Sequence, residues 1–145
     1  MKKTVNNFKM NVCAKSVNEG FLRACLASFA ALADPTVEEI SDIKTAVSEA
    51  VTNCIVHGYK EKEGRIYIDA SLFDDNSIRI KIRDKGCGIE DVKKAMEPLF
   101  TTAGDDRSGL GFTVMESFMD KVKVKSVKDR GTTVILTKKI TGKIR

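Results

Sequence analysis

Several residue types are scarce in this chain, and each scarcity narrows the classes of protein to which it can belong. The 145 residues include no tryptophan, two prolines and a single histidine, and aromatic residues make up 6% of them. One histidine, together with four cysteines that form no Cys-x-x-Cys pair, argues against a zinc site. The cysteines are therefore expected to be reduced thiols, as in a cytoplasmic protein.

Long apolar runs are also lacking. No stretch approaches the ~20 apolar residues that a membrane helix needs, and Asn6, Asn7 and Lys9 stand where a signal peptide would have its apolar core. We therefore expect a cytoplasmic protein with no membrane partner. Hydrophobic residues make up 42% of the chain and charged residues 31%, which is typical of a globular domain, here expected to be single and to span residues 1–145.

The net charge of +5 would suit a nucleic acid partner. Few aromatic residues accompany the lysines, however, and the lysines are expected to be spread over strand and helix surfaces. This pattern favours nucleotides or acidic proteins as partners, and no direct contact with nucleic acid is expected.

Local patterns predict the first elements of the fold. Apolar residues alternate with polar ones and predict a strand at 7–13. Ser16 and Glu19 have the spacing of a capping box, so a helix is expected to begin there and to end near Asp34-Pro35.

Thr36 and Glu39 repeat the capping-box spacing and predict the start of a longer helix, with Gly58 as its C-cap. Two alternating runs, at 66–72 and 78–82, then predict a hairpin. A glycine turn at 84–89 follows that hairpin directly.

The second half is predicted to hold a short helix at 90–96, a helix at 110–119 and two strands at 121–127 and 132–138. Residues 97–108 have no clear period, and an irregular segment of that length inside a compact domain is more often functional than structural. The order of elements predicts an α+β fold: a two-layer α/β sandwich in which helices cover one face of a mixed, mainly antiparallel sheet.

Glu49 and Asn53 are four residues apart on the longer predicted helix, so they share a face. The amide oxygen of Asn53 suits Mg²⁺, which takes few protein ligands, and Glu49 could deprotonate or orient an attacking group. Taken alone, such a pair is more often part of a solvated helix face.

Asp84 ends a predicted strand and could accept a hydrogen bond from an exocyclic amine such as that of adenine. Gly86 and Gly88 would let the backbone approach a base or phosphates closely, although, taken alone, they are more often explained by an ordinary glycine turn. Cys87 between them is expected to be a neutral filler.

Gly109 and Gly111 precede a predicted helix, whose N-terminal amides could hold phosphate. Arg107 could contact phosphate or a protein, and Thr132 could add a hydroxyl to a base pocket, although each is also compatible with a purely structural role. Neither a Walker A loop nor a Rossmann fingerprint is present.

In this order, these motifs resemble the GHKL superfamily of ATPases and kinases. Glu49-x3-Asn53 is similar to its N box, Asp84-x-Gly86-x-Gly88 to its first glycine box and Gly109-x-Gly111 to its second. Longer strings, including Ser48–Asn53, Pro98–Thr102 and Arg107–Glu116, resemble the family of sporulation anti-sigma-F factors, which are also serine kinases.

The resemblance implies roles at matching positions. Glu49 would be the catalytic base, Asn53 would hold Mg²⁺, and residues 97–108 would form a lid over ATP or ADP. Arg23 and Arg107 would contact protein partners. The residues implied for nucleotide binding are Asn53, Asp84, Gly86, Gly88, Thr101, Thr102, Ser108, Gly109, Leu110, Gly111 and Thr132.

The implied function is an anti-sigma factor that inhibits a sigma-F-type factor and phosphorylates a serine of an anti-anti-sigma protein. The family acts as a homodimer, which would pair through residues 7–13. One departure concerns the lid, where Ala103-Gly104-Asp105-Asp106 replaces an expected lysine and places two acids near phosphate.

Several alternatives share parts of the pattern. A general-stress anti-sigma kinase would use the same mechanism on another sigma factor, and a non-catalytic module would sequester sigma in a nucleotide-gated way. A histidine kinase fragment needs a phosphoaccepting histidine, whereas His57 lies inside the ATP motif. A gyrase-type ATPase would need a further domain.

Overall fold

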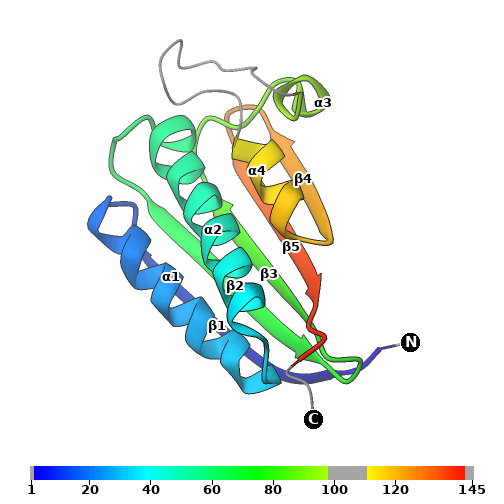
Figure 1. Ribbon diagram of the computed structural model, residues 1–145. Coiled ribbons are helices and arrows are strands. Elements are labelled where there is room, and N and C mark those ends of the chain that lie inside the picture. Colours follow the sequence, from blue (N-terminus) through cyan, green and yellow to red (C-terminus); the bar gives the residue numbers. More distant parts are fainter. Residues whose placement is uncertain (1, 98–110, 143–145) are drawn as a thin grey trace.

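The computed structural model describes residues 2–97 and 111–142, which form two layers (Figure 1). A five-stranded sheet has the order β1-β2-β3-β5-β4, and every neighbouring pair is antiparallel. The strands are β1 (Thr4–Cys13), β2 (Arg65–Phe73), β3 (Ser77–Asp84), β4 (Lys121–Val127) and β5 (Gly131–Lys139).

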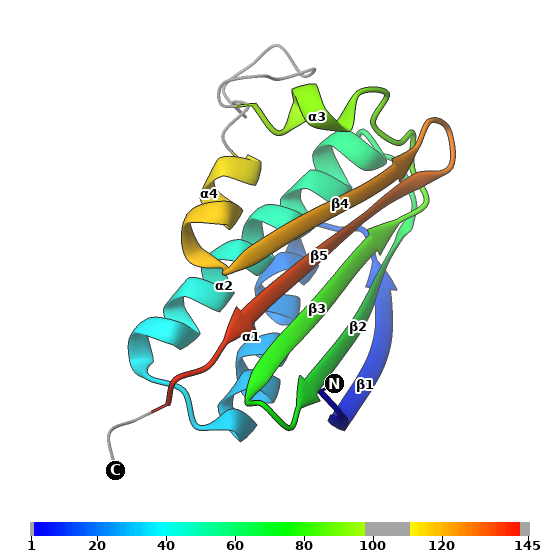
Figure 2. The ribbon, with the colours of Figure 1, turned by 90° about the vertical axis from the view of Figure 1, so that its right-hand side faces the viewer.

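The helices lie on one face of this sheet, which confirms the predicted two-layer sandwich (Figure 2). The sheet is not mixed, because β5 pairs between β3 and β4 and so separates the two strands that run in the same direction. The helical elements are α1 (Val17–Ala30), a 3₁₀ turn (Ala31–Ala33), α2 (Val37–Asn53), a π-turn (Cys54–Gly58), α3 (Val92–Ala95) and α4 (Gly111–Phe118). No helix among the described residues is long and apolar enough to cross a membrane.

The core lies between α1, α2 and α4 on one side and the sheet on the other. Alternate residues of the central strands point into it, and Ile66, Ile78, Ile80 and Ile82 are fully buried. At roughly 25 cal/mol per Å² of apolar surface, such burial is the main stabilising contribution. It also fixes the register of the strands, because a shift by one residue would expose every one of these side chains.

No helix covers the opposite face of the sheet (Figure 2). Its outward side chains are strongly basic. Among the described strand residues that point outward, Asp69 is the one carboxylate. The cations on this face are Lys9, Arg65, Arg79, Lys81, Arg83, Lys121, Lys123, Lys125 and Lys139. Nine cations less one carboxylate give this face +8, against +5 for the chain, so the rest of the chain carries −3. Six of the 18 lysines belong to this face, where alternate positions on separate strands come together.

One of the two predicted capping boxes is wrong. Ser16 precedes α1 with helical backbone angles and makes no side-chain capping bond, while the carboxylate of Glu19 is held by Arg23 instead. The second box is confirmed, since the Thr36 hydroxyl accepts from the Glu39 amide at 3.0 Å and the Glu39 carboxylate accepts from the Thr36 amide at 2.9 Å. An extended backbone at the N-cap distinguishes the two, because Thr36 has it and Ser16 does not.

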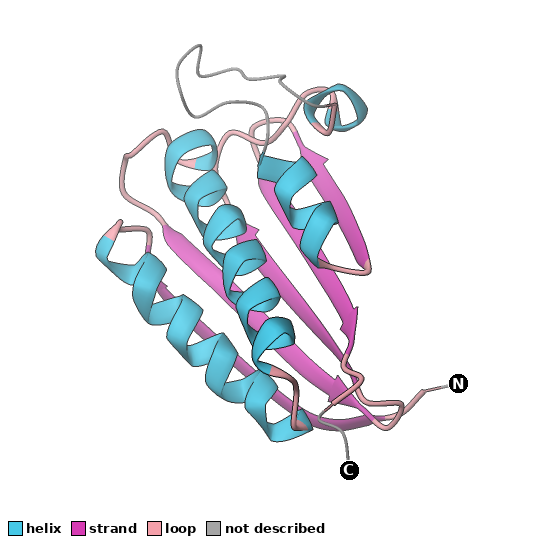
Figure 3. Ribbon diagram, viewed as in Figure 1, coloured by secondary structure: helices cyan, strands magenta, loops and turns pink. Residues whose placement is uncertain are grey.

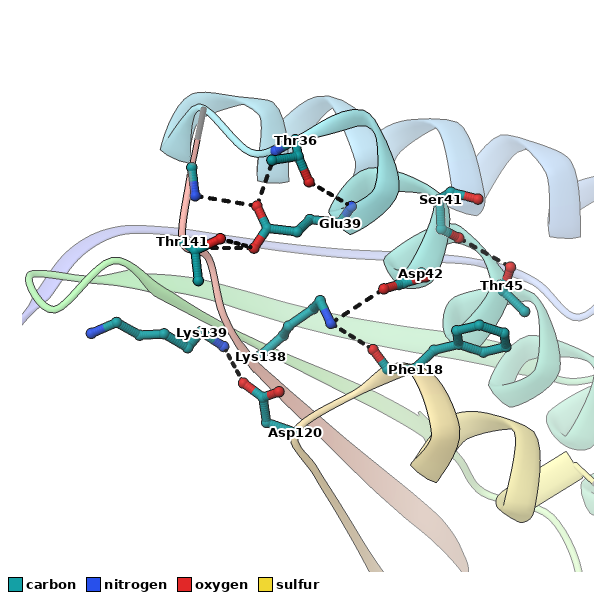
Figure 4. A network of polar contacts seen from close by, with 11 residues as sticks. Thr36, Glu39, Ser41, Asp42, Thr45, Phe118, Asp120, Lys138, Lys139 and Thr141 are labelled. Carbon is teal, nitrogen blue, oxygen red and sulfur yellow. Dashed lines mark hydrogen bonds and ion pairs between the residues drawn. The ribbon is translucent and has the colours of Figure 1, made fainter. Parts of the chain in front are cut away.

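Glu39 also ties the end of the chain to α2 (Figure 4). Its carboxylate accepts from the Thr141 amide and hydroxyl, each at 2.8 Å, and from the Gly142 amide at 3.2 Å. Burial raises the pKa of Glu39, but the hydrogen bonds from Thr36, Thr141 and Gly142 outweigh it and lower the pKa to about 2. We call these four residues the Glu39 clamp. Nearby, Lys138 donates to the Phe118 carbonyl at 2.7 Å and pairs with Asp42.

Replacing Glu39 with glutamine should lower the free energy of unfolding by about 2 kcal/mol, because hydrogen bonds to a charged acceptor contribute roughly 1.5–3 kcal/mol. The folded pKa of about 2 lies below the ordinary value of 4.5, so this stabilisation is present above pH 4.5 and is lost as the pH falls toward 2. Urea unfolding at several pH values measures both effects. Glu38→Gln, at the exposed neighbouring position, is the matched control, and equal stability of the two variants would contradict the prediction.

Candidate active site

A cavity of about 790 Å³ opens at one end of the sheet. The segment after α2, the loop between β3 and α3, and the β4–β5 turn lie at this end (Figure 3). The lining residues come from all three segments and from α4, and include Asn53, Cys54, His57, Gly58, Asp84, Cys87, Gly88, Phe112 and Thr132. The cavity therefore joins both predicted halves of the site, the N box and the first glycine box.

The π-turn forms the wall of the cavity next to α2. Helix α2 ends at Asn53 and continues as the wider turn Cys54–Gly58, in which the Tyr59 amide donates to the Cys54 carbonyl at 2.9 Å. Gly58 is therefore not the C-cap that the sequence predicted. Its lack of a side chain has another use, because a Cβ atom there would lie 2.8 Å from the Asp84 carboxylate. Single π-turns within helices are frequent at functional sites.

Asp84 stands at the end of β3 and is 3% exposed. Its Oδ1 accepts from the Gly86 amide at 2.9 Å. Burial nevertheless dominates and raises the pKa of Asp84 above its ordinary value. A buried acceptor at the wall of a cavity suits recognition of a ligand donor such as an amine.

Two glycines of the turn after β3 are required by close packing. A Cβ atom at Gly86 would overlap the carbonyl of Gly58, and one at Gly88, where φ is +74°, would overlap the carbonyl of Val127. The Cys87 amide donates to the Gly58 carbonyl at 2.9 Å, which locks the glycine turn to the π-turn. These contacts are between backbone segments and join two walls of the cavity, whereas the predicted approach of this backbone to a base or phosphates stays a prediction.

The N-box residues lie together near the start of α4. A Cβ atom at Gly111 would be 3.4 Å from both side-chain ends of Asn53 and 3.5 Å from a Glu49 oxygen. Asn53 lines the cavity and Glu49 lies one helical turn earlier. Burial, and then the negative charge of Glu19, raise the pKa of Glu49 above its ordinary value. A carboxylate with a raised pKa is a better proton acceptor than an exposed one.

Arg23 lies on α1, outside the cavity, and faces the N-box helix. Its Nη1 donates to both carboxylate oxygens of Glu19, at 2.9 and 2.7 Å, and to the Ser48 hydroxyl at 3.2 Å. The side chain remains 39% exposed. Arg23 can therefore reach a partner protein without leaving the vicinity of Glu49.

Thr132 is buried beside Asp84, its partner in the β3–β5 ladder. Its hydroxyl lies 2.8 Å from the Ser126 hydroxyl, which also accepts from the Ile89 amide at 2.7 Å. Thr132 thus lines the cavity, as predicted, while Ser126 anchors the residues that follow the glycine turn.

Three contributors were missed by the sequence reasoning: Cys54, Tyr59 and Ser126. The Tyr59 hydroxyl accepts from the Lys85 amide at 2.7 Å and donates to the Arg65 carbonyl at 2.6 Å, so it fixes the backbone beside Asp84. The roles of these residues depend on how separate segments pack together, which local patterns do not predict. The one signal in the sequence was that Cys54 and Tyr59 immediately follow Asn53 and Gly58.

Several predicted site residues lie outside the described residues. These are Thr101, Thr102, Arg107, Ser108, Gly109 and Leu110, together with most of the predicted lid at 97–108. Residues 2–97 and 111–142 contain no group of three or more His, Cys, Asp or Glu side chains placed to hold a metal ion.

Comparison with known proteins agrees with this geometry. The model of the family described as histidine kinase-like ATPase domain matches residues 14–138. The anti-sigma F factor of Thermoanaerobacter sp. (strain X514) is 55% identical over 136 residues, 93% of this chain and 94% of the relative. That of Clostridium acetobutylicum is 54% identical over 135 residues, 92% and 94% of the two chains.

A solved structure of the RsbU and RsbW domains of Rv1364c from Mycobacterium tuberculosis has a similar fold. It superposes with a TM-score of 0.71 at 22% identity, over 97% of this chain and 34% of that one. A blue-light activated histidine kinase domain from Erythrobacter litoralis superposes at 0.58 and 20% identity, over 85% and 61% of the two chains. At these identities the likeness concerns the fold.

The chain therefore belongs to the histidine kinase-like ATPase domain family, a class of nucleotide-binding kinase and ATPase domains. Within that class its family is that of the anti-sigma F factors, which it matches over nearly their whole length. The resemblance inferred from the motifs is confirmed.

Gly86→Ala should abolish nucleotide binding and lower the free energy of unfolding by about 1–3 kcal/mol, because the new methyl group must displace the Gly58 carbonyl. The matched control is Gly20→Ala within α1, where the nearest atom to a Cβ is Arg23 Nη2 at 3.5 Å. That change should stabilise by about 0.5–1 kcal/mol. Thermal unfolding and titration with ADP report both, and unchanged ADP affinity in Gly86→Ala would contradict the site assignment.

Proposed function

We propose that this protein is an anti-sigma factor that inhibits a sigma-F-type factor and, with ATP and Mg²⁺, phosphorylates a serine of an anti-anti-sigma protein. The observation that carries the proposal is the meeting of Glu49, Asn53 and Gly111 next to a cavity that Asn53 lines and that has a buried acceptor, Asp84, in its wall. Relatives that are named anti-sigma F factors support the choice of partner.

Different residues are proposed to bind the base and the phosphates of the nucleotide. Asp84 accepts a hydrogen bond from the adenine amine, with Thr132 beside it, and the glycine turn lets the base approach the backbone. Asn53 and the N-terminal amides of α4, beginning at Gly111, face the phosphates. Thr101, Thr102, Ser108, Gly109 and Leu110 are proposed to complete the phosphate site.

Asn53 is the residue proposed to hold Mg²⁺, since its amide oxygen suits that ion. When bound, Mg²⁺ neutralises charge on the phosphates. Glu49 would accept the proton of the target serine hydroxyl as its oxygen forms a bond to the γ-phosphorus. The bond from that phosphorus to the β-bridging oxygen breaks, and ADP leaves.

Partner exchange follows from phosphorylation. With ATP bound, the protein holds the sigma factor away from RNA polymerase, and the unphosphorylated anti-anti-sigma protein competes for it. Arg23, exposed on α1, and Arg107 are proposed partner contacts. A nucleotide can shift this equilibrium only by binding one complex more tightly than the other. Such a switch belongs in the cytoplasm, where transcription occurs.

We also propose a homodimer that pairs through residues 7–13. These residues belong to β1, the edge strand of the sheet, and an edge strand presents unpaired backbone groups to a partner. Analytical ultracentrifugation tests this directly, and a monomer at micromolar concentration would contradict it.

Glu49→Gln should lower the rate of serine phosphorylation by about 10²–10⁴-fold, the usual contribution of a general base. Incubation with γ-labelled ATP, Mg²⁺ and the anti-anti-sigma protein measures the label on serine. Glu38→Gln makes the same change of charge on an exposed part of α2 and should leave the rate unchanged. Full activity in Glu49→Gln would exclude it as the base. No labelling by the wild type, with sigma binding retained, would instead indicate a non-catalytic module.

As the pH is lowered, the phosphorylation rate should fall along an acid limb whose midpoint lies above pH 4.5. The ordinary pKa of glutamate is 4.5, and the pKa of Glu49 is raised above it. Glu19→Gln removes the negative charge that contributes to this rise and leaves Arg23 without that carboxylate. The acid limb should therefore move to lower pH. Single-turnover rates from pH 4 to 8 test the shift, and an unmoved limb would show that Glu19 does not act on Glu49.

A further inference from the structure

Three polar side chains form a row across the sheet at the cavity end. In the antiparallel ladders Asp84 of β3 pairs with Thr132 of β5, and Thr132 pairs with Ser126 of β4. Directly opposite residues of antiparallel strands project from the same face of a sheet, so the three side chains are neighbours. Asp84 and Thr132 line the cavity, whereas none of the steps proposed above uses Ser126.

The Ser126 hydroxyl contacts three polar groups, and their chemistry fixes the direction of each hydrogen bond. Its Oγ lies 2.7 Å from the Ile89 amide nitrogen, 3.0 Å from the Gly131 carbonyl oxygen and 2.8 Å from the Thr132 Oγ1. An amide N–H can only donate and a carbonyl oxygen can only accept. Ser126 therefore accepts from Ile89 and donates its single hydrogen to Gly131.

The hydrogen between the two hydroxyl groups must then come from Thr132. If Ser126 gave its hydrogen to Thr132 instead, the oxygens of Ser126 and Gly131 would lie 3.0 Å apart with no hydrogen between them, and they would repel each other. The assignment in which Thr132 donates to Ser126 is the one in which all three contacts are attractive.

This direction decides what Thr132 can offer a ligand. A hydroxyl group has one hydrogen and two acceptor lone pairs, so a Thr132 hydroxyl that donates to Ser126 can only accept from a group in the cavity. The ionised carboxylate of Asp84, its ladder partner, is also an acceptor. An exocyclic amine brings two hydrogens to such a pair, whereas a carbonyl oxygen in its place would find a donor in neither side chain.

We propose that Ser126 is a positioning residue that sets base specificity: by accepting the hydrogen of the Thr132 hydroxyl, it makes the cavity select a base with an exocyclic amine over a base with a carbonyl oxygen there. The inference rests on the proposed function, in which Asp84 accepts the adenine amine with Thr132 beside it. It adds the element that rejects other bases, because an oxygen facing two acceptors is left unpaired.

ADP and IDP test this role, since IDP has a carbonyl oxygen in place of the amine. Ser126→Ala removes the acceptor, so the Thr132 hydroxyl can turn its hydrogen toward the IDP oxygen. The ratio of the IDP to the ADP dissociation constant should fall about tenfold, as expected for one hydrogen bond. Loss of the contact to Ile89 acts on both nucleotides alike, so a merely structural role would not move this ratio.

The measurement is calorimetric titration of each nucleotide into the full chain. Ser126→Thr keeps a hydroxyl group and should hold the ratio within about threefold of the wild type. Thr132→Val removes the acceptor itself and should lower the ratio on its own, and in that background Ser126→Ala should have no further effect. The matched control is Ser117→Ala on α4, which removes an exposed hydroxyl that donates to the Thr113 carbonyl at 3.0 Å and should leave the ratio unchanged.

Circular dichroism checks that each variant is folded, and Thr132→Val tests the inference even where Ser126→Ala does not fold. An unchanged ratio in either variant would overturn the inference and leave the proposed function standing. Equal affinity of the wild type for ADP and IDP would do the same, as would an effect of Ser126→Ala that persists with Thr132→Val. A wild type that binds neither nucleotide would overturn the proposed function, and the inference with it.

Discussion

A carboxylate that is 3% exposed costs free energy to keep ionised, and at Asp84 the Gly86 amide reduces that cost with a hydrogen bond. Gly58 of the π-turn leaves room for the carboxylate, and Thr132 of β5 is the partner of Asp84 in the ladder. None of these contacts forms unless its segment is correctly placed. The position of Asp84 therefore depends on the packing of the whole cavity end of the sheet.

At the opposite end of the sheet, the carboxylate of Glu39 has a lowered pKa rather than a raised one. Glu39 receives four hydrogen bonds, and its pKa falls to about 2, whereas that of Asp84 rises despite its donors. Hydrogen bonds outweigh burial at Glu39, and burial outweighs them at Asp84. The first arrangement stabilises the fold, while the second leaves a carboxylate with a raised pKa in the wall of a cavity. Carboxylates whose pKa is perturbed in this way are more frequent at functional sites than elsewhere.

What could be predicted from the sequence was local. Helical spacing placed Glu49 and Asn53 on one face, and the alternation of apolar residues placed Asp84 at a strand end. The failures depend on tertiary contacts: Glu19 bonds Arg23 rather than completing a cap, and Gly58 makes room for Asp84 rather than ending a helix.

Features that depend on several strands could not be predicted from local patterns either. The basic face gathers alternate residues of all five strands, so its charge follows from the order and register of the sheet. The link from Ser126 to both Thr132 and Ile89 likewise depends on how the β4–β5 turn meets the loop after β3. Neither strand order nor such side-chain links can be obtained from the periodicity of one segment.

The pairing of β3 with β5 has a consequence for synthesis of the chain on the ribosome. Asp84 is translated well before Thr132, and the residues of the Glu39 clamp at 141 and 142 are translated later still. A nascent chain can form the β2–β3 hairpin and the α1–α2 layer early, but the cavity that Asp84 and Thr132 line is complete only when β5 has emerged. Nucleotide would then bind newly finished chains and favour the completed fold over its precursors.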